Sequence, residues 1–189
     1  MVKLGIICEG ESEVIIFKSE SFISFLNEIG IELIDVQATD AKNQFYGERI
    51  NSHRQILIDK GATHILALID LDKEECITIT KQKISPFENQ KIVVAVKEFE
   101  NWYLADTNAL SAFLSKPVEE IPLPEEFDEP IDEMIKLNVI TFAKSKPILA
   151  RKMLRSGFSI QNAANHPNCP SAKYFLTKLK QYASANLVE

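Results

Sequence analysis

Apolar residues gather in four short segments of the first half of the chain, and each segment is followed by polar or turn-forming residues. The segments cover residues 3–8, 31–36, 64–69 and 91–96. Short apolar segments between turn signals are typical of strands that are buried in a sheet. We therefore expect four strands.

Between these segments, apolar positions recur at the spacing of helices. Ser12 is placed to cap a helix that ends at Gly30, and a second helix covers residues 48–60 and ends at Gly61. Strands that alternate with helices predict an α/β fold with a four-stranded, mainly parallel sheet flanked by helices.

The second half of the chain lacks the strand pattern. We expect helices over residues 100–114, over residues 147–155 and from Pro170 onward. The acidic, proline-rich residues 117–133 predict an exposed connector. These elements suggest an α/β core over 1–106 and a helical extension over 107–189, which packs on the core within a single structural domain.

The composition is that of a soluble globular protein, with 46% hydrophobic and 25% charged residues. No apolar segment approaches the ~18 residues of a membrane helix, and the N-terminal residues lack the pattern of a signal peptide. The three cysteines are scattered, which favours reduced thiols over disulfides or structural zinc. We expect a cytoplasmic protein with no membrane partner.

The net charge of −6 is unevenly distributed along the chain. The residues from 141 onward carry a net +7, and the preceding 140 residues carry −13. The basic residues of this C-terminal region are Lys144, Lys146, Arg151, Lys152, Arg155, Lys173, Lys178 and Lys180. They could hold a nucleic acid near a metal site, or they could be the solvated faces of amphipathic helices.

Acidic residues follow three of the four predicted strands. Glu9 follows the first, Asp70 and Asp72 the third, and Glu98 and Glu100 the fourth. Because ligands collect beyond the carboxyl ends of parallel strands, we expect these acids to converge at one edge of the sheet.

Clustered carboxylates repel one another and destabilise a fold unless a cation neutralises them. A hard divalent ion with oxygen ligands, Mg²⁺ or Mn²⁺, suits this role. In an extended chain, Asp70 and Asp72 point to the same side and could address one metal or two. Gly10 follows Glu9, and its missing side chain leaves room for a phosphate or a metal-bound water. Each acid taken singly could be an ordinary turn residue, and the set together predicts a metal site.

Two of these segments carry a family resemblance. Residues 8–13 (CEGESE), after an apolar strand, resemble the first motif of Toprim domains, and residues 68–72 (LIDLD) resemble their Asp-x-Asp motif. Toprim domains occur in primases, topoisomerases, an RNA-maturing nuclease and the overcoming-lysogenization-defect (OLD) nucleases. The resemblance implies a Toprim or Rossmann-like fold and metal-dependent chemistry on phosphodiesters.

Two further segments resemble an uncharacterised bacterial Toprim-like family, domain of unknown function 4276. Residues 96–106 (VKEFENWYLAD) resemble its signature, and residues 169–175 (CPSAKYF) resemble its ending. That ending usually has Ser-Phe where Ser171-Ala172 stands here. The four segments occur in the family's order and together span nearly the whole chain.

The resemblance implies a nuclease that cleaves DNA or RNA and works with a separate AAA- or ABC-type ATPase in phage defence. The sequence contains no GxxxxGK[ST] phosphate-binding loop, so an ATP-driven step would need that other protein. Carried over by position, Glu9 would be the general acid/base or a metal ligand, and Asp70 and Asp72 would hold the metal. Three further acids are candidates for a second metal: Glu13, Glu98 and Glu100.

Two other residues could support this site. Lys97 could neutralise charge that develops on a phosphate, or it could be an exposed lysine at a strand end. Asp106 lies on roughly the same helical face as Glu98 and Glu100, where it could support the ligands or be solvated.

Two alternatives stay open. One is a Toprim-like scaffold whose activity is lost or conditional and which serves as the regulatory or binding partner of an ATPase; the acidic pI of about 5.2 favours it, because strong DNA binding by the chain alone is then doubtful. The other is a haloacid-dehalogenase-like phosphatase, because residues 68–72 also resemble the nucleophile motif of that class of enzyme. That motif belongs on a first strand, and this interpretation leaves Glu9 unexplained.

Overall fold

The computed structural model describes residues 1–137 and 145–185, and it has a single four-stranded parallel sheet within them. The strands are β1 (Val2–Cys8), β2 (Ile31–Ala38), β3 (His64–Asp70) and β4 (Gln90–Ala95), in the order β2-β1-β3-β4. The predicted α/β fold is confirmed, and each strand lies within two residues of its predicted bounds. Lys144 and Glu189, two residues of the charge asymmetry, lie outside the described residues.

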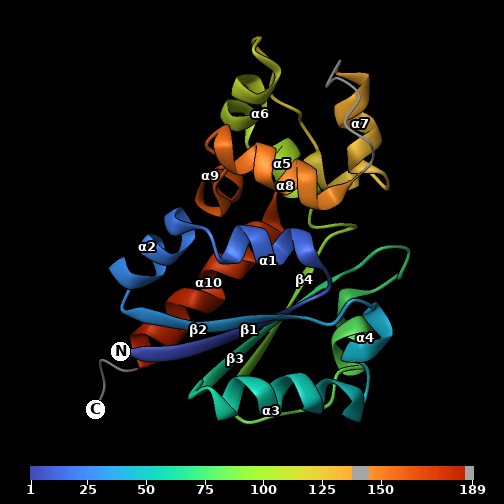
Figure 1. Ribbon diagram of the computed structural model, residues 1–189. Helices are drawn as coiled ribbons and strands as arrows, with labels where there is room; N and C mark the ends of the chain where they lie inside the picture. The colour runs from blue at the N-terminus through green and yellow to red at the C-terminus, as the bar shows by residue number, and fades with distance from the viewer. Residues whose placement is uncertain (138–144, 186–189) are drawn as a thin grey trace.

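Helices cover both faces of the sheet (Figure 1). One face carries α1 (Glu11–Phe17), α2 (Glu20–Glu28) and the long α10 (Pro170–Ala185), and the other carries α3 (Asn51–Asp59). The alternation of β3 explains this: Leu66 and Leu68 join the first apolar core, while Ile65, Ala67 and Ile69 join the second. A strand buried on both faces is continuously apolar, as this segment of the sequence is.

The remaining elements lie in the loops and above the carboxyl edge of the sheet (Figure 1). They are the 3₁₀ turns η1 (Lys42–Phe45), η2 (Glu48–Ile50) and η3 (Pro124–Glu126), and the helices α4 (Ile77–Gln82), α5 (Asn101–Ala105), α6 (Thr107–Leu114), α7 (Pro130–Lys136), α8 (Lys146–Arg155) and α9 (Ile160–Asn165). Residues of α5, α8 and α10 belong to the same apolar core as β1, so the helical extension shares its core with the sheet. No described helix is long and apolar enough to cross a membrane.

The helix expected between Ser12 and Gly30 is two helices, α1 and α2. Ser19 breaks it: its hydroxyl donates to Ile16 O (2.7 Å) and accepts from Phe22 N (3.3 Å), so it caps a new helix. The expected cap at Ser12 is also wrong, because Gly10 is the N-cap of α1 and Ser12 is buried in the first turn.

The helix expected over residues 100–114 is likewise divided, into α5 and α6. Asp106 stands at the break, and its carboxylate accepts from Ala109 N and from Ser159 N, both at 3.1 Å. A buried aspartate that caps one helix and binds the start of another stabilises the break by satisfying backbone donors.

The connector expected over residues 117–133 is not a simple exposed loop. It contains η3 and the start of α7, and Glu125 within it is only 6% exposed. The carboxylate of Glu125 accepts from Ser171 N (3.0 Å) and from the Ser171 hydroxyl, at the first turn of α10. An acid at a helix N-terminus satisfies free backbone donors, which explains its burial.

Close packing of α3 on β1 generates a stability prediction. A Cβ placed on Gly5 would lie 2.8 Å from Leu57 Cδ1 and 3.0 Å from Leu57 Cβ, and Leu57 is fully buried. Gly5→Ala should therefore lower the free energy of unfolding by about 1–3 kcal/mol in urea titrations. The same substitution made on a Leu57→Ala background should cost much less, because the obstructing side chain is gone. Equal costs in both backgrounds would contradict this origin.

Candidate metal centre at the carboxyl edge of the sheet

A cavity of about 300 Å³ lies at the carboxyl edge of the sheet, among the loops that follow the strands. Five of the six acids predicted as metal ligands line it: Glu9, Glu13, Asp70, Asp72 and Glu100. Glu11 and Asp40, which the sequence analysis did not single out, line it too. The cavity therefore brings together acids from α1, from the end of β3 and from the segments that follow all four strands.

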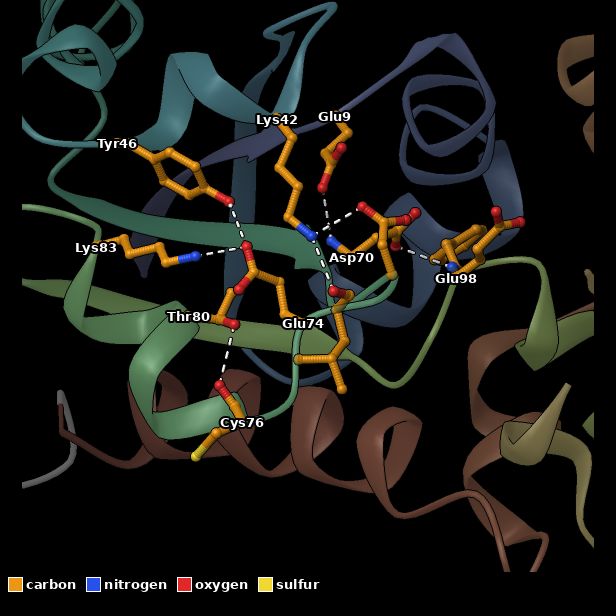
Figure 2. Close-up of polar contacts among 12 residues, drawn as sticks. Glu9, Lys42, Tyr46, Asp70, Glu74, Cys76, Thr80, Lys83 and Glu98 are labelled. Carbon is orange, nitrogen blue, oxygen red and sulfur yellow. Dashed lines mark hydrogen bonds and ion pairs between the residues drawn. The ribbon is translucent and has the colours of Figure 1, made fainter. Parts of the chain in front are cut away.

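Asp70 is the central residue of this cavity. Its backbone N–H donates to Glu9 Oε1 (2.8 Å), and its own Oδ1 accepts from the backbone N–H of Phe99 (2.9 Å) (Figure 2). Asp70 is the last residue of β3 and is 7% exposed. These two hydrogen bonds orient the carboxylates of Glu9 and Asp70. Each carboxylate uses one oxygen in its bond, Oε1 of Glu9 and Oδ1 of Asp70, and has a second oxygen besides.

Asp72 reaches the cavity by a different route from the one expected. The chain is not extended there, because Asp72 has a φ of 51° and turns back so that its N–H donates to Lys97 O (2.7 Å). The Asp72 carboxylate accepts from Lys42 Nζ (2.8 Å), and the same ammonium donates to Leu71 O (2.9 Å) (Figure 2). The extended-chain geometry is thus wrong, although both aspartates line the cavity.

The loop that carries Asp72 is also held from its other side. Glu74 accepts from the hydroxyl of Tyr46 (3.4 Å) and pairs with Lys83 of the segment after α4 (Figure 2). Burial, and then the charge of Glu74, raise the pKa of Tyr46 to about 12. The loop is therefore fixed by polar contacts from two neighbouring segments.

Lys146, the first residue of α8, brings positive charge to the cavity from the helical extension. Its ammonium lies 3.1 Å from Glu100 Oε2 and 3.2 Å from Glu98 Oε2. The Glu100 side chain is 2% exposed and that of Glu98 is 20% exposed. Glu98 does not line the cavity, but it joins the cluster through this shared ammonium.

The cavity holds more buried negative charge than its ammonium groups balance. Burial and then repulsion from Glu100 raise the pKa of Glu13 to about 8. Burial raises the pKa of Glu9 to about 7, with Asp72 adding to the shift against the hydrogen bond from Asp70. Burial and the charges of Glu13 and Glu100 also raise the pKa of Asp70.

Lys146 responds in the complementary direction. Burial alone would lower the pKa of its ammonium, but the carboxylates of Glu100 and Glu98 outweigh burial and raise it. Lys146 is therefore a permanent cation in the cavity at physiological pH.

The donor set fits a hard divalent cation. Every acidic side chain that lines the cavity presents carboxylate oxygens, which are ligands that Mg²⁺ and Mn²⁺ prefer. Burial and mutual repulsion raise the pKa values of Glu9, Glu13 and Asp70, and a divalent cation would favour their charged forms. Within residues 1–137 and 145–185, however, no three His, Cys, Asp or Glu side chains are already arranged to hold a metal. Hydrogen bonds and the two lysines set their present positions.

Three other residues from the sequence analysis have defined places. Gly10 lines the cavity, and a Cβ there would lie 3.5 Å from Glu13 Oε2, so a side chain would project toward that carboxylate. Lys97 has its ammonium 2.6 Å from Asp128 Oδ1 and does not line the cavity. Asp106 caps α6 and lines a separate polar hollow with His166.

Sequence reasoning missed Lys42 as a site residue. It lies in a polar loop without a pattern, and only the fold brings it beside Asp72. Lys146 was noticed as one charge of the basic region. Nothing in the sequence indicated that, among the described residues of that region, it is the cation that lines the acid cavity.

No protein-family model and no curated protein matches the chain. Among solved structures, it is similar to the C-terminal region of an OLD protein from Xanthomonas campestris pv. campestris, with 15% identity, 98% of both chains covered and a TM-score of 0.45. It is also similar to the C-terminal region of an OLD protein from Burkholderia pseudomallei, with 12% identity, a TM-score of 0.47, and 95% of this chain and 99% of that chain covered.

The raised pKa of Glu13 predicts how stability depends on pH without metal. The folded protein holds a proton on Glu13 up to about pH 8, whereas the unfolded chain releases it near pH 4.5. Stability should therefore fall as pH rises between about 5 and 8. Thermal melts in EDTA should show a shallower fall for Glu13→Gln, and the matched change Glu11→Gln at the exposed rim should leave the slope unchanged. Parallel curves for Glu13→Gln and the wild type would contradict the assignment.

Proposed function

We propose that this site binds Mg²⁺ or Mn²⁺ and hydrolyses phosphodiester bonds of DNA or RNA. One observation carries the proposal: five of the predicted acids line one cavity, and burial and mutual repulsion raise the pKa values of Glu9, Glu13 and Asp70. Buried acids in this state gain most from a bound divalent cation.

The sequence motifs support the phosphodiester substrate. The two segments that resemble Toprim motifs, residues 8–13 and 68–72, supply five of the seven acids that line the cavity. Residues 96–106, which resemble the signature of the uncharacterised Toprim-like family, supply Glu98 and Glu100. The residues that carry the resemblance are thus also the residues that meet in space.

The chain's own residues have distinct roles in this proposal. Asp70 and Asp72 hold the metal, with Glu13, Glu98 and Glu100 available for a second ion. Glu9 would act as the general acid/base or as a further metal ligand, because it lines the cavity and its Oε1 is held by Asp70 N. Lys146 supplies a fixed positive charge for the phosphate. When bound, the metal would activate water and stabilise the leaving oxygen.

A separate ATPase and a role in phage defence belong to the same proposal. They rest on the resemblance to the Toprim-like family. We assign no role to Lys97, because its charge is paired with Asp128.

A second candidate is a conditional or silent scaffold that binds an ATPase. One observation favours it: Lys42 and Lys146 already pair with Asp72, Glu98 and Glu100, and no three ligands within the described residues stand ready for a metal. In such a protein the ammonium groups would permanently replace the ions. The phosphatase alternative is not proposed, because Asp70 ends the third strand and Glu9 would have no role.

The test is cleavage of labelled single- and double-stranded DNA and RNA by the pure protein with Mg²⁺ or Mn²⁺. Asp70→Asn keeps an oxygen to accept from Phe99 N but loses the charge, and it should lower the rate at least ~100-fold. Glu9→Gln should do the same. Glu119→Gln, an exposed acid outside the cavity, serves as the matched control and should cleave like the wild type.

Calorimetric titration with Mn²⁺ separates the two candidates. The nuclease proposal expects binding that Asp70→Asn weakens together with cleavage. If the wild type binds no metal and cleaves nothing, alone or with a neighbouring ATPase, the enzyme proposal is wrong and the scaffold stands.

A further inference from the structure

A second cavity, of about 260 Å³, lies at the open edge of the sheet, and we call it the edge groove. β4 is the last strand of the sheet, and the edge groove runs beside it between α4 and α10. Its walls are mainly apolar, from Ile77 of α4, Val94 and Val96 of the β4 segment, and Pro170 of α10. Lys81 of α4 and Ser171 and Tyr174 of α10 complete the lining.

Two lysines converge on Tyr174 at this groove. Lys81 Nζ lies 3.2 Å from the Tyr174 hydroxyl and 4.3 Å from the centre of its ring. Lys178, one turn along α10, has its Nζ 4.6 Å from the same ring centre. Tyr174 itself is 37% exposed. The outer wall of the groove is therefore a partly exposed aromatic ring with two ammonium groups beside it.

These two lysines differ from those of the metal centre because they lack acid partners. Lys42 and Lys146 each pair with a carboxylate. Within the described residues, no ion pair joins Lys81 or Lys178 to an acid, and the other contact of Lys178 is the neutral Gln181 Oε1 (3.0 Å). Two like charges held beside one tyrosine repel each other, and an anion between them would relieve the repulsion.

The pKa of Tyr174 reflects the same excess of positive charge. Burial would raise the pKa of the Tyr174 hydroxyl, but Lys81 and Lys178 outweigh burial and lower it. In a chain with a net charge of −6, this local excess marks a place where a polyanion can approach.

Two short segments limit the distance between the edge groove and the metal centre. Val96, in its wall, stands two residues before Glu98, and two residues span at most ~7 Å. Ile77, in the opposite wall, follows Asp72 by five residues, which span at most ~18 Å. These separations correspond to the length of a few nucleotides, so one strand is long enough to contact both places.

We propose that the edge groove binds an unpaired stretch of the nucleic acid that the metal centre cleaves. A phosphate lies between the ammonium groups of Lys81 and Lys178, and a neighbouring base rests on the apolar wall. The apolar wall favours an unpaired strand, because a base can enter such a groove only when it is free of its partner. An acidic peptide would satisfy the lysines and leave the apolar wall unfilled. This inference rests on the proposed nuclease function.

The experiment measures binding of a short fluorescein-labelled single-stranded oligonucleotide by anisotropy, in EDTA so that no cleavage occurs. The Lys81→Ala/Lys178→Ala variant should bind at least ~10-fold more weakly than the wild type. The slope of its log K against log salt should become shallower by ~0.7 for each phosphate that the variant no longer neutralises. Tyr174→Ala should weaken binding more than Tyr174→Phe, which keeps the ring. Lys3→Ala/Lys116→Ala removes the same charge from exposed positions outside the groove and is the matched control.

Three outcomes would overturn the inference: no binding by the wild type, equally weakened binding in the groove variant and the control pair, or equally tight binding of a labelled polyglutamate. Failure of the proposed function looks different, since the oligonucleotide would still bind through Lys81 and Lys178 while no metal supported cleavage. The converse result is cleavage that depends on Asp70 while the groove variant binds the oligonucleotide as tightly as the wild type. That result would support the proposed nuclease function and contradict binding of the oligonucleotide in the edge groove.

Discussion

The hydrogen bonds through Asp70 join the carboxyl ends of three parallel strands, and the candidate site depends on them. The N–H of Asp70 binds Glu9 after β1, and its carboxylate binds the N–H of Phe99 after β4. β3 lies between these two strands in the sheet. Loss of the Asp70 acceptor would leave the buried Phe99 N–H unsatisfied, at a cost of about 1–3 kcal/mol. The residue that would hold a metal is thus also the residue that aligns the strand ends.

This arrangement places negative charge where burial limits its screening by water, and other parts of the fold supply positive charge. Lys42 comes from the loop after β2, and Lys146 comes from the first turn of α8. The helical extension is therefore more than a cover for the sheet, because one of its residues contributes to the charge balance of the site. Two ammonium groups still leave the pKa values of Glu9 and Glu13 raised, so the compensation is partial.

The sequence was sufficient to predict the sheet and the acids at its edge, since both follow from local patterns. Apolar segments specify buried strands, and parallel strands bring their following residues to one edge. Lys42 and Lys146 could not be predicted in the same way, because they meet Asp72 and Glu100 across 30 and 46 residues of chain. Such contacts depend on how loops and helices pack, and no periodicity records them.

The divided helices are a different case, because their signals are local. Ser19 and Asp106 are residue types that favour helix N-caps, and each caps a new helix inside a stretch whose apolar spacing continues across the break. Apolar spacing alone therefore predicts one continuous helix in each of these two stretches. A serine or aspartate inside an apolar-periodic stretch is therefore a warning that the backbone can be capped there and turn.

The four motif segments differ in their physical roles. Residues 8–13 and 68–72 bring acids to the cavity, whereas residues 169–175 bring none. Instead, the Ser171 hydroxyl accepts from Trp102 Nε1 (2.8 Å) and binds the carboxylate of Glu125.

Trp102 belongs to the third segment, so the third and fourth segments contact each other in a buried polar chain. That chain fixes the start of α10 against α5, directly after Glu100. Ala172, which stands where the family usually has phenylalanine, is fully buried beside it. The departure therefore falls on packing between helices and leaves the acids of the metal centre intact.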